Sequence, residues 1–217
     1  MPNKSIATTR ESNSTGFTLV EFLVAVAVVA LLSAFALAAA GGATERAKAM
    51  QCLQAIRTVG AAVQMYAGDN NGRLPASSHL RAADGSSLSW TNSLATYLGT
   101  NFIGRCPGVP EHRARITYGW NDFLTDAKGA GVALALCRSP SATLALGELA
   151  TNQTSEHFHF RGASRGRVTP SFFRTMVNVE CHGAGANYLF VDGHAESLAW
   201  TQVQERLNQT NTVFLQP

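Results

Sequence analysis

The most reactive side chains of this 217-residue chain are its four cysteine thiols. The cysteines are Cys52, Cys106, Cys137 and Cys181. No two of them have the C-x-x-C spacing that is typical of zinc ribbons and of thioredoxin-type redox sites. Spacing alone therefore predicts neither kind of site, and four cysteines allow three different disulfide pairings.

Six histidines provide further groups that can ligate a metal. His157 and His159 have strand spacing, which places both side chains on one face. His182 and His194 flank a short segment, and their imidazoles could form a metal site with the carboxylate of Asp192. The alternative is structural. In that case Asp192 bonds the backbone of its own turn, and His182 holds the incoming strand by a hydrogen bond.

One segment has the pattern of a hydrolase nucleophile. Gly162-Ala163-Ser164-Arg165-Gly166 satisfies G-x-S-x-G, but that motif requires a helix directly after the serine turn. Here Arg167-Val168-Thr169-Pro170 follows instead. Asp192 and His194, only two residues apart, are also poor partners for orienting a catalytic imidazole. We therefore expect no enzyme, and a secreted hydrolase is the least favoured alternative.

Two other segments carry groups that suit ions or anionic partners. Asp69-Asn70-Asn71 groups oxygen ligands that suit a structural calcium ion, without the spacing of an EF-hand. A basic stretch contains Arg161, Arg165, Arg167 and Arg174. It could face a polysaccharide, lipid headgroups or a nucleic acid. A solvated loop is the better interpretation because no interleaved aromatic residues offer a stacking platform. We expect no nucleic-acid partner and no resident cofactor.

Hydrophobic residues are unevenly distributed along the chain. The whole chain is 46% apolar and 14% charged with a net charge of +3, which excludes a disordered tail protein and a polytopic membrane protein. Residues 17–40, however, hold 21 apolar residues and one charge, Glu21. As a helix, this segment is about 36 Å long and could cross a hydrocarbon core of about 30 Å.

Two interpretations of the apolar segment compete. A secretory signal peptide would be cleaved near Ala38-Ala39-Ala40, which offers small residues. However, the segment is longer than the roughly 7–15 apolar residues of a signal peptide, and it contains Glu21. An unpaired charge in lipid costs at least about 2.5–3.5 kcal/mol, so Glu21 is predicted to be functional.

The residues around Glu21 resemble a known family. Gly16-Phe17-Thr18-Leu19-Val20-Glu21, followed by an uninterrupted apolar helix, is similar to the class III signal of type IV pilins and type II secretion pseudopilins. The resemblance implies that a prepilin peptidase cleaves between Gly16 and Phe17 and methylates the new amine of Phe17. It also implies that Glu21 of an incoming subunit pairs with the Phe17 amine of a neighbour, which offsets the burial of the carboxylate. Ser14-Thr15 stand where the family often has Lys or Arg.

A second resemblance lies near the carboxy terminus. His182, nine residues and then Asp192-Gly193 are similar to an H-x9-DG signature of many pseudopilin-like proteins. The stretch from Cys52 to Arg105-Cys106-Pro107 also resembles that group. In an extracytoplasmic head of this kind, the expected disulfides are Cys52 with Cys106 and, as a weaker hypothesis, Cys137 with Cys181.

Local patterns predict the elements that position these residues. An amphipathic helix continues the apolar segment, with apolar Leu53, Ile56, Val59, Val63 and Tyr66 at steps of three and four. Turn residues 68–72 end it. The other expected elements are a helix at 90–98, strands at 116–118 and 143–149, a hairpin of 187–191 with 194–200 through a type I′ turn at Asp192-Gly193, and a helical turn at 202–207.

The expected fold class is α+β, a pilin-like lollipop with a small antiparallel sheet in its head. Its parts are a leader (1–16), a transmembrane helix (17–40), an amphipathic continuation (41–67) and an extracytoplasmic head (68–217). The resemblance implies a single-pass protein of the bacterial inner membrane that contacts lipid, a prepilin peptidase and other pilin or pseudopilin subunits. A platform protein and an assembly ATPase would act indirectly. We expect a structural subunit; the alternative is a membrane-tethered envelope protein that binds a carbohydrate or metal.

Overall fold

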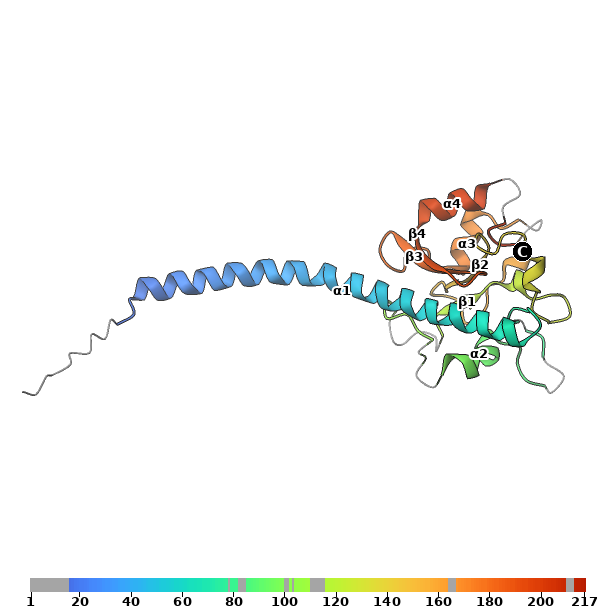
Figure 1. Cartoon of the computed structure of the whole chain (residues 1–217). Coiled ribbons are helices and arrows are strands. Elements are labelled where there is room, and N and C mark those ends of the chain that lie inside the picture. Colours follow the sequence, from blue (N-terminus) through green and yellow to red (C-terminus); the bar gives the residue numbers. More distant parts are fainter. Residues whose placement is uncertain are drawn as a thin grey trace, which may run out of the picture. The chain divides into compact units, whose positions relative to one another are not determined.

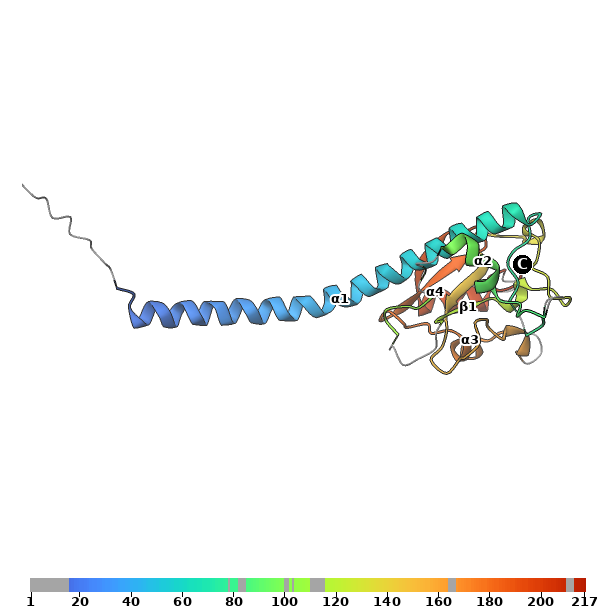
Figure 2. The same cartoon turned by 90° about the horizontal axis from the view of Figure 1, so that it is seen from below.

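The computed structural model describes residues 16–77, 79–81, 85–99, 102, 104–109, 116–163, 167–209 and 213–217. Residues 1–15 of the predicted leader lie outside this set. The chain divides into two compact units, with the division between Ala43 and Thr44, and each unit is described by itself. Figures 1 and 2 show the helices and strands in two views.

The first unit contains the amino-terminal part of helix α1 (Leu19–Asp69, 51 residues). Alanine is the commonest residue of this part and favours helix most strongly, whereas leucine, which also favours helix, is as frequent as valine. An 18-residue window of α1 has a mean hydropathy of 2.7, and none of it is buried. Among the described residues, α1 is the one helix long and apolar enough to cross a membrane, although a signal sequence would pass the same test.

The second unit begins with the rest of α1. The predicted apolar stripe is confirmed, with buried Leu53, Ile56, Val59 and Val63 and a partly buried Tyr66. The helix ends two residues later than predicted, where Asn71 and Gly72 take positive φ angles of 54° and 71°. The amide of Gly72 donates to the carbonyl of Ala67 at 2.8 Å, which satisfies a terminal carbonyl group.

Four antiparallel strands form one sheet in the order β1-β2-β3-β4. The strands are β1 (Tyr118–Trp120), β2 (Leu144–Glu148), β3 (Gly185–Phe190) and β4 (Ala195–Ala199). The predicted strand at 143–149 and the predicted hairpin are confirmed. The strand predicted at 116–118 begins two residues later than expected.

Helices cover both faces of the sheet in the two views (Figures 1 and 2). On one face, Ile56 of α1 and Trp90 of α2 (Trp90–Leu98) share a buried cluster with Trp120. On the other face, α3 (Pro170–Met176) and α4 (Trp200–Asn208) share a second cluster with the carboxy-terminal Phe214. The α+β fold class is therefore confirmed, as are the helices predicted at 90–98 and 202–207.

Helix α3 was not predicted. Thr169 caps it by accepting a hydrogen bond from the amide of Phe172 at 3.2 Å, and Pro170 occupies the first turn, where no amide donor is needed. Residues 167–169 are not helical, so no helix directly follows Gly166, as expected, and α3 begins only at Pro170. Among the described residues, the head also contains the 3₁₀ segments η1 (Asp122–Leu124), η2 (Leu134–Leu136) and η3 (Phe160–Gly162).

The turn between β3 and β4 differs from the prediction. A type I′ turn needs two residues with positive φ, but in this turn only Gly193 has one, at 92°. Gly193 donates to the carbonyl of Phe190 at 2.9 Å, and Phe190 donates to the carbonyl of His194 at 2.9 Å. This is a tight turn followed by a glycine bulge, in which the Asp192 carboxylate accepts from the amide of His194 at 3.1 Å.

This turn packs directly on the backbone of α1. A Cβ atom at Gly60 would lie 2.4 Å from the carbonyl oxygen of Gly193 and 2.7 Å from Cδ1 of Leu189. One helical turn later, the side-chain Nε2 of Gln64 donates to the carbonyl of Val191 at 2.9 Å. Gly60 is therefore required for this close approach of helix and hairpin.

We expect Gly60→Ala to lower the free energy of unfolding by about 1–3 kcal/mol, because a backbone carbonyl must move to admit the methyl group. Gly68→Ala is the matched control in the same helix. Nothing lies within 4 Å of a Cβ at Gly68, so this change should stabilise by roughly 0.5 kcal/mol through lower chain entropy. Thermal denaturation of both full-length variants in detergent measures the difference, and equal effects would contradict the packing described.

Candidate functional site

The amino-terminal site consists of the residues just before α1. Gly16, Phe17 and Thr18 precede the first helical residue, Leu19, and all three are exposed. The peptide bond between Gly16 and Phe17 therefore lies outside the helix. A peptidase can reach such a bond without unwinding α1.

Glu21 bonds locally at the start of α1. Its carboxylate accepts from both the amide and the hydroxyl of Thr18, at 2.8 and 2.7 Å, and the amide of Glu21 donates to the Thr18 hydroxyl at 3.3 Å. These bonds form a capping box. The T-x-x-E spacing of Thr18 and Glu21 is the sequence signal of this cap. In the single chain, then, Thr18 satisfies the Glu21 carboxylate.

A second cluster lies inside the head. Among the described residues it brings together metal-ligating atoms of Cys52, Cys106, Glu148 and His182, all within 4.8 Å of one another. Cys52 comes from α1 and Glu148 from β2, whereas Cys106 follows α2 and His182 precedes β3. Cys52 and Glu148 are fully buried, and Cys106 is 1% exposed.

The Glu148 carboxylate is the centre of this cluster. Its Oε1 atom lies 2.6 Å from Sγ of Cys52 and accepts from Nε2 of His182 at 2.8 Å. Its Oε2 atom accepts from the amide of Asn187 at 3.2 Å. Nε2 of His182 is also 3.3 Å from Sγ of Cys106. The remaining nitrogen of His182, Nδ1, is buried and has no hydrogen-bond partner among the described residues, so the ring interacts with the cluster through Nε2.

Burial and mutual proximity shift the pKa values of these groups. The neighbouring Cys106 thiol and desolvation raise the pKa of Cys52, and contact with Cys181 helps to raise the pKa of Cys106. Burial alone lowers the pKa of His182, but its hydrogen bonds to Cys52 and Glu148 outweigh this effect and raise that pKa to about 10. At neutral pH, Cys52 and Cys106 are therefore thiols, and the imidazole of His182 is protonated.

All four cysteines are free thiols in the structure, so neither predicted disulfide, Cys52 with Cys106 or Cys137 with Cys181, is present. Cys52 is directed at Glu148 and at the hydroxyl of Tyr118, whose oxygen is 3.1 Å from Sγ. The sulfur of Cys106 lies 3.8 Å from that of Cys181 and within 4.8 Å of that of Cys52. Cys137 lies 3.9 Å from the carbonyl oxygen of Ala133.

The histidines proposed as weak metal candidates fall into separate groups. His157 and His159 do lie together, with ring centroids 4.8 Å apart, and His79 joins them at 4.7 and 5.1 Å. His194 instead bonds Asp192 through Nδ1 at 2.6 Å, contrary to the expectation that these two are poor partners. His182 belongs to the buried cluster, so the predicted set of His182, His194 and Asp192 is not assembled.

The remaining predicted sites receive different partners. Ser164, Arg165 and Gly166 lie outside the described residues, and the 3₁₀ segment η3, not a strand, precedes them. The Asp69 carboxylate accepts from the hydroxyl of Tyr97 at 2.9 Å. Arg174 pairs with Glu180 at 2.7 Å. Arg161 donates to the carbonyl of Asp122 at 3.1 Å, so two of the four arginines are engaged within the head.

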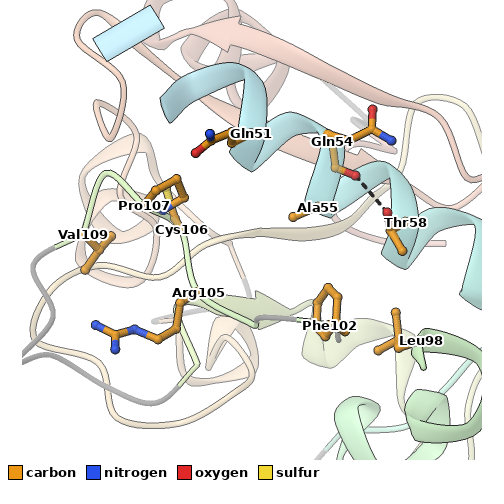
Figure 3. A pocket seen from close by; sticks show the side chains of 10 residues that line it. All are labelled: Gln51, Gln54, Ala55, Thr58, Leu98, Phe102, Arg105, Cys106, Pro107 and Val109. Atoms are coloured by element: carbon orange, nitrogen blue, oxygen red, sulfur yellow. Dashed lines mark hydrogen bonds between the residues drawn. The ribbon is translucent and has the colours of Figure 1, made fainter. Parts of the chain in front are cut away.

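A groove of about 690 Å³ lies between α1 and the segment that follows α2 (Figure 3). Gln51, Gln54 and Thr58 line it from α1, and Phe102 and Arg105 line it from the opposite side. Cys106 also lines the groove and is the one residue that it shares with the buried cluster. The groove therefore connects the surface to the edge of that cluster.

Comparison with known proteins bears on the amino-terminal site. The family model of the prokaryotic N-terminal methylation motif matches residues 12–37, a range that includes Gly16, Phe17 and Glu21. Together with the long apolar helix and the small antiparallel sheet, this match supports a type IV pilin-like protein. No curated protein and no solved structure matches the chain. The resemblance of residues 182–193 to the H-x9-DG signature stays a prediction.

The buried His157 generates a prediction about acid stability. Desolvation, together with repulsion from His159 and His79, lowers the pKa of His157 to about 4. Its unfolded pKa is about 6.5, so the unfolded chain takes up this proton first, and stability is lost as the pH falls from about 6.5 to about 4. We expect this loss to be on the order of 3 kcal/mol. His157→Gln should flatten the dependence of the melting temperature on pH in that window, and parallel curves for parent and variant would contradict the assignment.

Proposed function

We propose that the protein is a pseudopilin or minor pilin of a type II secretion or type IV pilus-like assembly. The observation that carries this proposal is the match of residues 12–37 to the methylation motif, directly at the start of an exposed apolar helix. The motif itself implies processing by a prepilin peptidase and assembly with other pilin subunits. We place the apolar part of α1 in the bacterial inner membrane and the head outside the cytoplasm.

The apolar surface of α1 supports a role in assembly. Every described side chain from Phe17 to Leu37 is exposed, and such a surface is stable only in lipid or against other apolar helices. A filament whose core is made of these helices provides the second environment. The proposed subunit moves from lipid into the filament core. A platform protein and an assembly ATPase would supply the energy for this transfer.

Glu21 would set the order of subunits in this filament. Among the described residues of the single chain, its carboxylate accepts hydrogen bonds from the amide and hydroxyl of Thr18. After cleavage, the methylated amine of Phe17 in a neighbouring subunit offers a cation, and a charged pair in an apolar environment is stronger than a bond to a hydroxyl. The exchange of Thr18 for this amine would then favour one stagger between neighbours.

An envelope binding protein is the alternative function. One observation favours it, namely the cluster of His79, His157 and His159 beside a surface cavity of about 340 Å³. Three imidazoles can hold a metal or bind polar ligands. Such a protein needs an anchor but no pairing between subunits, so changes at Glu21 separate the two functions.

Intact-mass spectrometry of the native protein tests the processing step. Loss of the first 16 residues leaves 201, beginning with Phe17. We expect the mass of this chain with one added methyl group. A mass that begins near Gly41 would instead indicate a secretory signal peptide, and an unprocessed chain of 217 residues would contradict both routes.

Two variants separate the assembly role of Glu21 from its capping role. Glu21→Gln keeps a side chain that can serve in a capping box but removes the charge, so we expect normal membrane insertion and loss of filament assembly or secretion. Thr18→Ala removes the cap at a cost of about 1 kcal/mol but keeps the charge, so assembly should persist. Assembly that survives Glu21→Gln would refute the subunit model.

A further inference from the structure

The buried cluster of the head has the composition of a metal site. Two thiols, one imidazole and one carboxylate are the ligand types that zinc takes in proteins, and four protein ligands close a structural site. We propose that Cys52, Cys106, Glu148 and His182 bind one Zn²⁺ ion, which holds the head together. The ligating atoms would be the two sulfurs, Nε2 of His182 and an oxygen of Glu148.

The distances between these atoms fit one shared ion. In a tetrahedral zinc site with bonds of about 2.0–2.3 Å, neighbouring ligand atoms lie about 3.3–3.8 Å apart. Here Glu148 Oε1 lies 2.6 Å from the sulfur of Cys52 and 2.8 Å from Nε2 of His182, and Nε2 lies 3.3 Å from the sulfur of Cys106. All four ligand atoms lie within 4.8 Å of one another, and binding would lengthen each of these three separations by about 1 Å or less.

Neighbouring groups contact three of the four ligands, namely Cys52, Cys106 and Glu148. Tyr118 places its hydroxyl 3.1 Å from the sulfur of Cys52. The amide of Gly108 donates to the sulfur of Cys106 at 3.4 Å, and the amide of Asn187 donates to Oε2 of Glu148 at 3.2 Å. Hydrogen bonds to ligand atoms of this kind stabilise thiolate and carboxylate forms, as around other protein metal sites.

The cluster joins parts of the head that are distant in sequence. Cys52 lies 96 residues from Glu148, and Glu148 lies 34 residues from His182. One ion would link α1, the segment after α2, strand β2 and the segment before β3. Because the unfolded chain does not hold these ligands together, the binding free energy of the ion would add to folding stability.

Zinc binding is balanced by the release of protons. The thiols of Cys52 and Cys106 each give up a proton to solvent, and His182 binds as the neutral imidazole. The ion and its four ligands then carry one net negative charge. The groove shown in Figure 3 reaches Cys106 and provides the entry path for the ion.

Cys181 offers a competing state for the same cysteine. Its sulfur lies 3.8 Å from that of Cys106, so an added oxidant, itself reduced in the reaction, could join the two as a disulfide with loss of both thiol protons. Ligation by zinc and this disulfide exclude each other at Cys106. Measurements on the native protein therefore distinguish Cys106 bound to zinc from Cys106 in a disulfide with Cys181.

The test uses the full-length protein, purified in detergent with a tag that lacks histidine. We expect about one zinc ion per chain by elemental mass spectrometry. Zinc X-ray absorption should show two sulfur neighbours at about 2.3 Å and two nitrogen or oxygen neighbours at about 2.0–2.1 Å. Protein isolated without zinc, or with a disulfide between Cys106 and Cys181 in a non-reducing peptide map, would overturn the proposal.

Variants locate the ion. The double change Cys52→Ser with Cys106→Ser should abolish zinc binding. Cys137→Ser, a buried cysteine outside the cluster, and His159→Ala, in the other histidine cluster, should each keep about one ion per chain. If His159→Ala loses zinc and the double variant keeps it, the ion binds at the cluster of His79, His157 and His159, and the proposal is refuted.

A measurement on the unchanged protein covers the case in which the double variant does not fold. Removal of zinc by a chelator should lower the melting temperature of the head, and added Zn²⁺, but not Mg²⁺, should restore it. A melting temperature that stays the same after the zinc has been removed would contradict the structural role.

Discussion

The packing of the apolar stripe of α1 on the sheet is the contact on which the rest of the head depends. The stripe that buries Ile56 and Val59 also carries Cys52 and Gly60. Cys52 thereby reaches Glu148 of β2, and Gly60 lets the β3–β4 turn approach the helix backbone. A rotation of α1 about its axis would remove the thiol and the glycine from their partners together, so core packing and the cluster are a single constraint.

This constraint gives the predicted H-x9-DG segment a physical meaning. His182, at its start, bonds Glu148, while Gly193, at its end, lies against Gly60. The nine residues between His182 and Asp192 contain all of β3, an inner strand of the sheet. The nine-residue spacing is therefore the length needed for β3 and its flanking residues. A polar contact to Glu148 holds one end of this segment, and close packing against Gly60 holds the other.

Sequence patterns predicted what depends on neighbours along the chain, and they failed where distant residues decide. Helix α2 and strands β2 to β4 were predicted because local periodicity encodes them. The prediction of a type I′ turn was wrong, because the Asp-Gly dipeptide does not indicate how the turn packs on α1. Glu148 was missed as a site residue, although a carboxylate inside the apolar strand Leu144–Glu148 was a usable signal. His79 could not be assigned to His157 and His159, because no pattern links positions so far apart.

Glu21 and Glu148, the two carboxylates in apolar surroundings, differ in how far along the chain their hydrogen-bond partners lie, and this difference suits them to different functions. Glu21 is satisfied by Thr18, only three residues away, and a stronger partner from another subunit can replace that contact without unfolding anything. Glu148 is held by Cys52, His182 and Asn187, which are 96, 34 and 39 residues away, so the fold itself fixes its environment. A carboxylate with a local, exchangeable partner suits assembly. One with distant, fixed partners suits a permanent ligand, because releasing it would require the head to open.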